Sequence, residues 1–330
     1  MKNAQYCLFK TERKRVVWEI THKCNYACKH CCSSSGNMDT TQELSYPEVL
    51  TVLDQLEVLE VEEIYYSGGE PFSRDDMLPI LTETKKRNII ANVSTNGSYL
   101  TAQLAERLRE IGVNLIHISL DSRNRETYNH FRGGNYFDRT VKAIQEAKYA
   151  GLYVRVGAVI WRGNVDQLEE LIEFMRSLRV DELVFNWLVA VGRLRENREV
   201  QVPLERFNLV TEWIQRARER YADSIRISMH RSERYQEDGS ACRGGESILY
   251  ITPKGNISPC SWIAKLDPAM VTTETLREKA LMELLESAEF KAWRRMLAER
   301  GSRCHAGCPA ICLEREGTYF SEDPLLEPLR

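Results

Sequence analysis

The stretch "ITHKCNYACKHCCSSSG" (residues 20–36) contains four of the ten cysteines of the chain. Cys24, Cys28 and Cys31 have the spacing Cys-x3-Cys-x2-Cys, and Cys32 follows directly. Three thiolates from one short loop can hold three irons of a [4Fe–4S] cube and leave the fourth iron without a protein ligand. A zinc ion normally takes four ligands, and a neighbouring histidine or Cys32 could complete such a set. The triplet therefore favours an open iron–sulfur cluster, with zinc as the alternative.

The composition of the chain limits the classes of protein to which it can belong. Its 330 residues are 43% hydrophobic and carry a net charge of −3, which suits one large α/β domain with a smaller appendage. Charges of both signs are interspersed, so the sequence does not indicate a nucleic-acid partner. No segment approaches the roughly 20 apolar residues that span a membrane, and the N-terminus lacks the apolar region of a signal peptide. We therefore expect a cytoplasmic protein without a membrane partner, in which clustered cysteines bind metal more often than they form disulfides.

The remaining cysteines predict a second site. More than two hundred residues without a cysteine follow Cys32. Five cysteines then occur in the last third of the chain: Cys242, Cys260, Cys304, Cys308 and Cys312. Only Cys7 stands apart from both groups. Two separate cysteine sites are therefore expected.

Between the two cysteine groups, six predicted strands alternate with amphipathic helices. The strands are expected at 16–21, 62–67, 89–94, 114–120, 152–160 and 182–189. The helices between them are expected at 45–60, 75–87, 101–111, 137–150 and 165–178. Ser45 and Glu48 fit a capping box at the start of the first helix. Such alternation is typical of parallel strands joined by helical crossovers.

Polar residues recur on one face of these strands. His117, Ser119 and Asp121 share a face, because successive side chains of a strand point to opposite sides. Ser94 and Asn96 share a face in the same way one strand earlier. An open sheet covered by helices on both sides would be apolar on both faces. The polar face instead favours a curved, barrel-like sheet that binds a ligand on its inner side.

The chain changes character after Gly192. A charged connection leads to a helix expected at 203–222 and a short strand at 224–229, and then to a β-hairpin with its turn at 253–256. A further helix is expected at 276–299, before a loose C-terminal tail. The domains expected from these changes are an N-terminal extension (1–15), the barrel (16–198), a connecting helix and strand (199–235), a cysteine-rich module (236–318) and the tail (319–330).

Two glycines and a carboxylate follow the second strand in "SGGEP" (67–71). Ligands of α/β sheets bind at the carboxyl ends of parallel strands, and Glu70 could accept an amine there. A tight turn capped by Glu70 is the alternative. Together with the cysteine triplet after the first strand, this turn resembles the radical S-adenosylmethionine (SAM) superfamily. "STNG" (94–97), "SLD" (119–121) and "FRGG" (131–134) match in the same order, so the resemblance covers about residues 16–192.

The resemblance implies a partial (β/α)6 barrel of the TIM type in which SAM binds the free iron of a [4Fe–4S] cluster. The implied cluster ligands are Cys24, Cys28 and Cys31. The methionyl amine of SAM is then held by Gly68, Gly69 and Glu70. Ribose and carboxylate contacts are implied for Ser94, Asn96, Ser119, Asp121 and Arg132. Reduction of the cluster would cleave SAM to methionine and a 5′-deoxyadenosyl radical, which takes a hydrogen atom from the substrate.

The second cysteine group resembles the SPASM and twitch cluster domains of radical SAM enzymes. The matching features are Cys242, Gly255 in the hairpin turn and Cys260. A full SPASM domain has seven cysteines for two clusters, whereas this chain has five, and its last three are spaced Cys-x3-Cys-x3-Cys. We therefore expect one auxiliary [4Fe–4S] cluster held by four of the five late cysteines in an α+β module. A structural zinc ion is the alternative at this site.

Members with this architecture modify peptides or oxidise small molecules. We expect modification of a ribosomally made peptide by a thioether or carbon–carbon cross-link, epimerisation or a related step. About fifteen residues precede the first strand, so leader binding is expected to need a separate protein. Radical oxidation or cyclisation of a small molecule is the enzymatic alternative, and an electron carrier or zinc scaffold is the non-enzymatic one. The expected electron donor is a flavodoxin or a ferredoxin.

Overall fold

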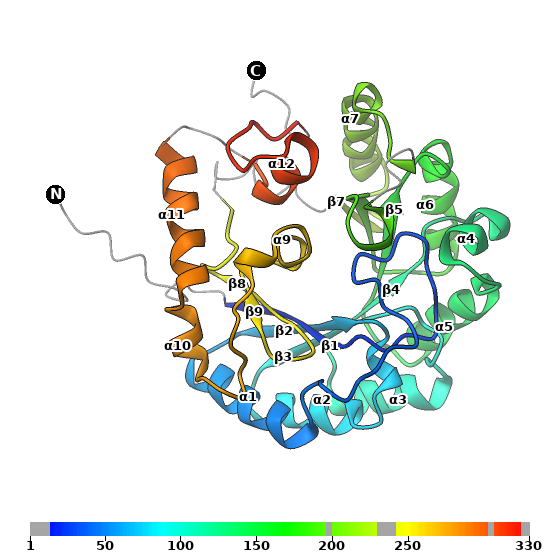
Figure 1. Ribbon diagram of the computed structural model, residues 1–330. Helices are drawn as coiled ribbons and strands as arrows, with labels where there is room; N and C mark the ends of the chain where they lie inside the picture. Colours follow the sequence, from blue (N-terminus) through cyan, green and yellow to red (C-terminus); the bar gives the residue numbers. More distant parts are fainter. Residues whose placement is uncertain (1–13, 196–199, 230–241, 303–306, 325–330) are drawn as a thin grey trace.

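A computed structural model of the chain describes residues 14–195, 200–229, 242–302 and 307–324. Its centre is one curved sheet of nine strands in the order β7-β6-β5-β4-β3-β2-β1-β8-β9 (Figure 1). The strands are β1 (Arg15–Thr21), β2 (Glu63–Gly68), β3 (Ile90–Thr95), β4 (Leu115–Ser119), β5 (Val154–Ile160), β6 (Glu182–Trp187), β7 (Arg226–Met229), β8 (Ile248–Ile251) and β9 (Ile257–Ser258). Neighbouring strands are parallel except β8 and β9, which form an antiparallel hairpin.

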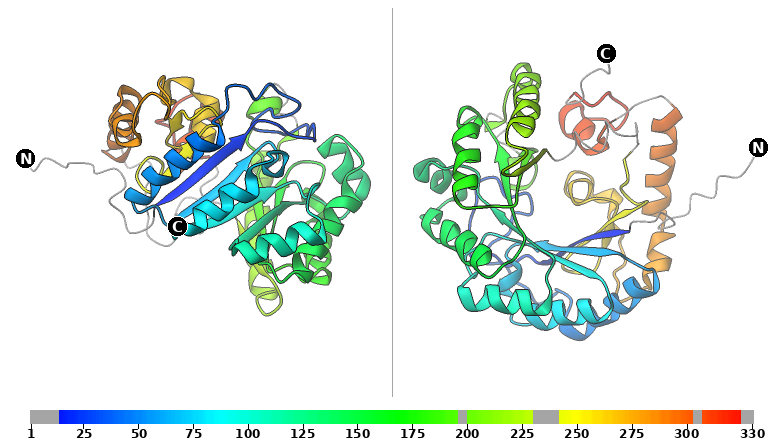
Figure 2. Two further views of the ribbon diagram at one scale, coloured as in Figure 1. Left: turned by 90° about the horizontal axis from the view of Figure 1, so that it is seen from below. Right: turned by 180° about the vertical axis from the view of Figure 1, so that it is seen from behind.

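Helices connect the strands and cover the convex side of the sheet. The barrel helices are α1 (Tyr46–Val58), α2 (Met77–Lys86), α3 (Ala102–Ile111), α4 (Arg125–Arg132), α5 (Phe137–Tyr149), α6 (Leu168–Ser177) and α7 (Leu204–Arg220). The cysteine-rich module contributes α9 (Ser261–Leu266), α10 (Leu281–Leu285), α11 (Ala288–Ser302) and α12 (Pro309–Glu316). The barrel helices follow the outer curve, and α9 and α12 lie on the concave side (Figures 1 and 2). Among the described residues, no helix has the length and apolar character needed to span a membrane.

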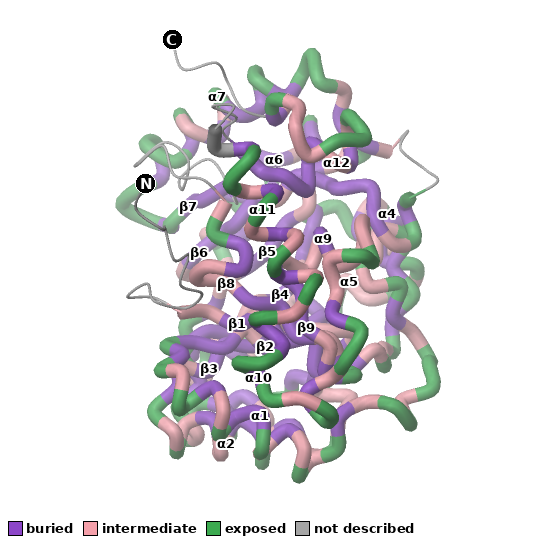
Figure 3. Tube along the Cα trace, turned by 60° about the vertical axis from the view of Figure 1, so that its left-hand side comes forward, coloured by how far each residue is buried: buried purple, intermediate pink, exposed green. Residues whose placement is uncertain are grey.

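The two faces of the sheet differ as the sequence predicted. Ile116 and Ile118 of β4 are fully buried in the main hydrophobic core between the sheet and the outer helices. His117 and Ser119, on the opposite face, are only partly buried. Figure 3 shows that buried residues are concentrated along the strands of the sheet. The partly exposed polar face of β4 is compatible with a ligand site on the concave side of the sheet.

Local signals in the sequence determine where several helices begin and end. The N–H of Ser45 donates to the Glu48 carboxylate over 2.7 Å, which confirms the capping box that begins α1. The Thr101 hydroxyl accepts from the Leu104 N–H at the start of α3. Gly112 ends α3 in the left-handed conformation that favours glycine. These helix boundaries follow from a few residues each.

The strand β7 and the hairpin β8–β9 extend the sheet beyond the six strands predicted for the barrel. β7 pairs with β6 at one edge, and β8 pairs with β1 at the other. Without them, β1 and β6 would each expose a row of unpaired backbone N–H and C=O groups. The predicted hairpin turn is confirmed, with Gly255 at a φ of +92° and its N–H donating to the Thr252 carbonyl over 3.0 Å.

The helix expected at 276–299 is wrong, because the structure has two helices, α10 and α11, in that segment. Glu286 and Ser287 separate them. The Ser287 hydroxyl accepts from the Phe290 N–H at 3.4 Å, so a new helix starts where a continuous one was predicted. The short helix α4 was not predicted, although Asn124 begins it with a hydrogen bond from the Thr127 N–H.

The expectation of a loose C-terminal tail is wrong for the described residues up to 324. The Tyr319 hydroxyl donates to Asp267 over 2.7 Å. Asp323 is buried and accepts from the Cys308 N–H at 2.8 Å. The tail is therefore packed against the module next to one of its predicted cluster ligands.

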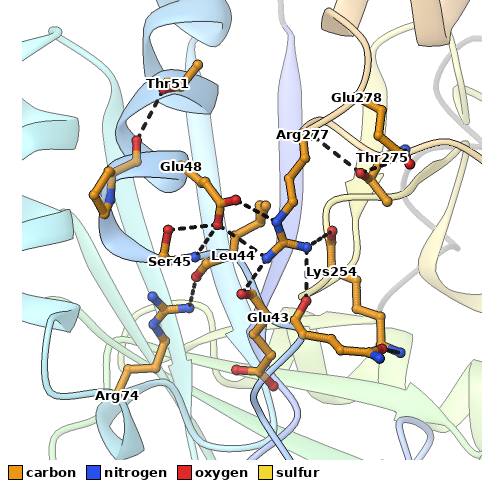
Figure 4. Close-up of polar contacts among 12 residues, drawn as sticks. Glu43, Leu44, Ser45, Glu48, Thr51, Arg74, Lys254, Thr275, Arg277 and Glu278 are labelled. Carbon is orange, nitrogen blue, oxygen red and sulfur yellow. Dashed lines mark hydrogen bonds and ion pairs between the residues drawn. The ribbon is translucent and has the colours of Figure 1, made fainter.

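Arg277 connects the module to the barrel near the start of α1 (Figure 4). Its guanidinium donates to the Glu48 carboxylate at 2.6 Å and to the carbonyls of Glu43 at 2.6 Å and Gln42 at 3.1 Å. The hydrogen bond with Arg277 lowers the pKa of Glu48 to about 2. Glu48 therefore caps the start of α1 and also attaches the module to the barrel.

Candidate active site and metal centres

The cysteine loop follows β1 and is folded back on itself by backbone hydrogen bonds. The Cys24 N–H donates to the Gly36 carbonyl at 2.8 Å, and the Gly36 N–H donates to the His22 carbonyl at 3.2 Å. Cys28 is buried, and Cys24 and Cys31 are partly buried. The loop brings the three predicted ligands together at the carboxyl end of the parallel sheet, where ligands of such sheets bind.

Residues after β6 hold this loop from the other side. The Arg193 N–H donates to the Cys31 carbonyl at 3.1 Å, and its guanidinium donates to the carbonyls of Cys28, at 2.8 Å, and Ser35. Gly192 has a φ of +60°, and a Cβ at this position would lie 2.3 Å from the Cys31 carbonyl oxygen. Glycine is therefore required for this close approach. Arg193 fixes the shape of the loop through three of its carbonyl groups.

Asp121 and Arg132 form a buried ion pair beside Cys28. Arg132 donates from Nε and Nη2 to the two Asp121 carboxylate oxygens at 2.7 and 3.0 Å. The Val159 N–H donates to the same carboxylate at 3.0 Å. Burial alone would raise the pKa of Asp121, but Arg132 holds it below its usual value. Because Arg132 Nη1 lies 3.9 Å from Cys28 Sγ, the pair also brings positive charge to the cysteine loop.

Glu70 is fully buried between the turn after β2 and the end of β3. Its carboxylate accepts from the Thr95 hydroxyl at 2.8 and 2.9 Å and from the Asn96 N–H at 2.8 Å. Burial raises the pKa of Glu70 to about 7. The Asn96 side-chain amide lies 3.7 Å from Cys24 Sγ. Glu70 therefore fixes the end of β3 next to the cysteine loop, in addition to the amine contact that the resemblance implies.

Gly68 and Gly69 lie against the start of the cysteine loop. The Gly69 N–H donates to the Thr21 carbonyl at 2.7 Å. A Cβ on Gly69 would be 2.2 Å from the Lys23 carbonyl oxygen, and one on Gly68 would be 2.3 Å from the Thr21 carbonyl oxygen. Close backbone packing therefore requires both glycines even without a ligand, as the tight-turn alternative expects.

Ser94 and Ser119 lie on the inner face of β3 and β4, and both are partly buried. Ser94 pairs in register with His117, whose ring lies over Gly157 of β5. Burial and the positive charge of Arg155 lower the pKa of His117 to about 4, so its ring is neutral at pH 7. These side chains give the inner face neutral hydrogen-bonding groups.

Three stacked rings connect the cysteine loop to the end of β5. The ring centroids of His30 and Phe131 are 3.9 Å apart, and those of Phe131 and Trp161 are 4.3 Å apart, with nearly parallel planes. Burial lowers the pKa of His30 to about 3, so it stacks as an uncharged ring. Neither Phe131 nor Trp161 was predicted here, because contacts among residues 30, 131 and 161 leave no periodic signal in the sequence.

Three of the five late cysteines come together beside a small hydrophobic cluster. Cys308 is buried within the cluster, and Cys242 and Cys260 pack against it. Burial and the neighbouring thiols of Cys308 and Cys260 raise the pKa of Cys242. The structure thus brings together cysteines that are up to 66 positions apart in the sequence.

The other late cysteines differ in their surroundings. Cys312 is buried on α12, and Arg300 Nη2 lies 3.3 Å from its Sγ. Cys304 lies outside the described residues, as does Cys7. Cys312 and Cys304 are therefore the two candidates for the fourth ligand of an auxiliary cluster.

The cysteine groups fit iron–sulfur clusters by their chemistry. Burial and the neighbouring Glu70, Cys28 and Cys31 raise the pKa of Cys24 to about 11. Three such thiols can therefore all be thiolates only when a bound cation balances their negative charge. Iron supplies that positive charge, and the thiols that bind it lose their protons. Within the described part of the chain, no group of three or more possible ligands is arranged to hold a single metal ion.

One ion pair between the two sites was not predicted. Lys265 of α9 donates from Nζ to Glu19 on the inner face of β1 over 2.7 Å. The Ser33 hydroxyl, two residues after Cys31, donates to the same carboxylate oxygen. The sequence places the charged side chain of Glu19 on the polar face of β1, which indicates that it needs a partner. That partner, Lys265, is 246 residues away in the sequence and could not be predicted.

A curved parallel sheet with a thiol triplet after its first strand, and a second thiol group in an attached module, defines an iron–sulfur barrel protein. Two family models match the chain: the radical SAM superfamily over residues 18–175 and an iron–sulfur cluster-binding domain, SPASM, over residues 242–309. The chain belongs to the radical SAM superfamily. It is an enzyme whose cofactors are SAM, the [4Fe–4S] cluster that binds SAM and an auxiliary [4Fe–4S] cluster.

Several characterised proteins are similar to the chain. AdoMet-dependent heme synthase from Methanosarcina barkeri is 25% identical, over 94% of this chain and 95% of its own length. PqqA peptide cyclase from Rhizobium meliloti is 27% identical, over 96% and 88%. The mycofactocin maturase MftC from Mycolicibacterium smegmatis is 36% identical, over 47% and 40%. The crystal structure of Streptococcus suis SuiB bound to S-adenosylmethionine shares the fold, with a TM-score of 0.77, 15% identity and coverage of 95% and 77%.

Proposed function

We propose that this radical SAM enzyme modifies a ribosomally made peptide. When bound, SAM supplies a 5′-deoxyadenosyl radical that takes a hydrogen atom from the substrate. The modification is a thioether or carbon–carbon cross-link, an epimerisation or a related step. Relatives at 27% and 36% identity are named a peptide cyclase and a maturase, which supports this substrate class.

The observation that carries this choice is the charge balance of the inner face. Three of its described basic side chains are each paired with a carboxylate at 2.7 Å: Lys265 with Glu19, Arg132 with Asp121 and Arg155 with Glu182. A substrate with several carboxylates binds best where cations are available to it. A peptide segment instead needs neutral hydrogen-bonding groups and apolar contacts. The balanced lining supports a peptide.

A haem-related small molecule is the second candidate substrate. The likeness to AdoMet-dependent heme synthase from Methanosarcina barkeri covers 94% of the chain. A tetrapyrrole with acidic side chains would have to displace one of the three ion pairs of the inner face or bind outside it. The two candidates therefore predict different effects of the paired cations on substrate affinity.

We assign the SAM-binding cluster to the thiols of Cys24, Cys28 and Cys31. SAM itself is assigned to Gly68, Gly69, Glu70, Ser94, Asn96, Ser119, Asp121 and Arg132. The auxiliary cluster is assigned to Cys242, Cys260 and Cys308, with Cys304 or Cys312 as its fourth ligand. The short distances from Asn96 to Cys24 and from Arg132 to Cys28 support the first two assignments.

The chemistry is tested by anaerobic reconstitution with iron and sulfide, followed by SAM and dithionite. The enzyme is expected to release 5′-deoxyadenosine and methionine, and a Cys28→Ala variant is expected to release neither, because the cube loses a ligand. Release that is equal in both proteins would contradict the assignment of the triplet.

The substrate is tested with a short peptide encoded beside the gene, deuterated at its Cα atoms and side chains, and in parallel with a haem-precursor tetrapyrrole. A peptide substrate is expected to transfer deuterium to 5′-deoxyadenosine and to change mass, with the loss of two hydrogens for a cross-link. Deuterium transfer from a deuterated tetrapyrrole and none from the peptide would reverse the choice.

The proposal includes three further expectations. A flavodoxin or ferredoxin supplies the electron that reduces the SAM-binding cluster, a separate protein binds the leader of the peptide, and the reaction takes place in the cytoplasm. An enzyme that works with dithionite and remains inactive with reduced flavodoxin or ferredoxin would contradict the first.

A further inference from the structure

The ion pair between Glu19 and Lys265 lies between the two cysteine sites. Its side chains are 5% and 13% exposed, so both charges are largely removed from water. Lys265 is on α9, the helix that begins directly after Cys260. The Tyr250 hydroxyl accepts a second hydrogen bond from Lys265 Nζ at 3.1 Å, and the ammonium lies 4.8 Å from the centre of the Tyr250 ring. The pair thus joins the module to the inner face of the barrel.

The same carboxylate is also connected to the cysteine loop. Ser33 donates to Glu19 two residues after Cys31. The positive charge of Lys265 is near enough to Cys260 and Cys32 to interact with both thiols. One cation is therefore linked to the predicted ligands of the auxiliary cluster through α9 and to the SAM-cluster loop through Glu19 and Ser33.

Burial makes this contact sensitive to the loss of either partner. The second carboxylate oxygen of Glu19 is buried with no hydrogen-bond partner and lies 4.0 Å from His22 Nδ1. Without Lys265, the buried carboxylate would lose its principal counter-charge, which is far more costly than the loss of an exposed ion pair. The contact therefore constrains both elements that it joins.

We propose that Lys265 is a positioning residue that couples the auxiliary module to the SAM-cluster loop and raises the reduction potential of the auxiliary cluster. Lys265 places α9, and with it Cys260, relative to Ser33 and Cys31. Its charge stabilises the additional negative charge of a reduced cluster nearby. The proposal rests on the assignment of Cys260 and Cys31 as cluster ligands.

The test uses the reconstituted, cluster-containing enzyme and compares Lys265→Met, Lys265→Arg and Glu19→Gln with a matched control, Arg277→Met. Arg277 attaches the same module to the barrel at the start of α1, through Glu48 and two backbone carbonyls of the 42–43 segment. Two readouts are taken under anaerobic conditions: hydrogen–deuterium exchange of residues 31–36 and 261–266, and the midpoint potential of the auxiliary cluster in a redox titration followed by electron paramagnetic resonance.

Lys265→Met is expected to speed exchange in both segments by about tenfold or more. Arg277→Met is expected to speed exchange only near residues 42–48 and to leave the potential unchanged. The potential is expected to fall in Lys265→Met, which removes a positive charge, and to rise in Glu19→Gln, which removes a negative one. Lys265→Arg is expected to keep the wild-type potential. If the substitutions only loosened the module, the midpoint potential would shift in the same direction in Lys265→Met and in Glu19→Gln.

Unchanged exchange at residues 31–36 in Lys265→Met, or potentials that shift in the same direction in Lys265→Met and Glu19→Gln, would overturn the proposal. Failure of the ligand assignments is recognised separately by iron analysis. Two cubes require about eight irons per chain, and Cys260→Ala is expected to reduce this to about four. A Cys260→Ala protein that keeps its full iron content would show that the assignment, and not the coupling, is wrong.

Discussion

Glu70 accepts hydrogen bonds from Thr95 and Asn96 while fully buried, and its pKa is raised to about 7. A carboxyl group whose folded pKa is raised binds its proton more tightly in the folded state. The neighbouring pair of Asp121 and Arg132 shows the opposite case, since an adjacent guanidinium lowers the pKa of the carboxyl group. At the scale of single residues, the pKa of the same chemical group is therefore shifted in opposite directions on two sides of one site.

The raised pKa of Glu70 predicts a pH dependence of stability in the absence of SAM. Between the ordinary value of 4.5 and about 7, the folded state holds the proton more tightly than the unfolded state. The stabilisation is fully present below about pH 4.5 and is lost as the pH rises through about 7. Glu70→Gln cannot ionise and is expected to lose less stability than the wild type between about pH 5 and pH 8 in urea unfolding. Equal losses in the two proteins would show that Glu70 is not the titrating group.

The burial of the Asp121–Arg132 pair predicts that a single substitution at Asp121 strongly lowers the free energy of unfolding. Asp121→Asn leaves Arg132 buried with its charge uncompensated, and we expect the free energy of unfolding to fall by about 3 kcal/mol or more. Asp138→Asn is the matched control, because the side chains of the Asp138–Arg125 pair are 70% and 57% exposed. The control is expected to lose less than about 1 kcal/mol. Chemical denaturation distinguishes the two variants, and similar losses would refute this account of the buried pair.

At the scale of elements, the turn after β2 and the loop after β1 form one packed unit. Gly69 and Glu70 donate their N–H groups to the carbonyls of Thr21 and Lys23 at 2.7 and 2.8 Å. Arg193, after β6, donates to the far side of the same loop. The geometry of the cysteine loop is therefore determined by segments that follow two other strands.

Gly69→Ala is predicted to disrupt this unit. The new Cβ would lie 2.2 Å from the Lys23 carbonyl oxygen, so the turn or the cysteine loop must move. We expect a loss of about 2 kcal/mol or more in the free energy of unfolding, together with weaker binding of SAM to the reconstituted enzyme. Gly317→Ala is the control, since its Cβ would meet no atom within 4 Å and only the left-handed φ of +71° opposes it. A Gly69→Ala protein that binds SAM like the wild type would contradict the close packing of the turn.

At the scale of the whole molecule, the cysteine-rich module is built into the barrel. β8 pairs with β1, and Leu281 and Phe290 are buried in the main hydrophobic core with the barrel residues. Lys265 connects the module to the inner face, and Arg277 connects it to α1. Separation of the module from the barrel would therefore expose apolar surface of a shared core.

Arg277→Met is predicted to weaken this attachment modestly. Arg277 is 30% exposed, and its hydrogen bonds with Glu48 and with backbone carbonyls are expected to contribute about 1 to 2 kcal/mol together. The pKa of Glu48 is lowered to about 2, so its contribution is present above about pH 4.5 and is lost as the pH falls towards 2. The variant is therefore expected to be less sensitive to acid than the wild type in thermal unfolding over this range. An unchanged acid sensitivity would show that the pair does not carry the effect.

The sequence alone predicted the features that depend on neighbouring residues. The cysteine triplet, the turn at 67–71 and the alternation of strands and helices each occupy a short segment, and the polar face of β4 follows from the two-residue period of a strand. Helix boundaries were predicted where a capping pair such as Ser45 and Glu48 was present. The helix predicted at 276–299 was wrong because its interruption at Ser287 has only one weak local signal.

The tertiary structure decided the features that join distant segments. The pairing of β8 with β1, the stack of His30, Phe131 and Trp161, and the contact between Glu19 and Lys265 connect residues that are between about 30 and 246 positions apart. Such contacts leave no periodicity, because each depends on how the whole sheet curves and on which strand covers its edge. The sequence therefore determined the chemistry of this radical SAM enzyme, and the tertiary structure determined how its two cysteine sites are connected.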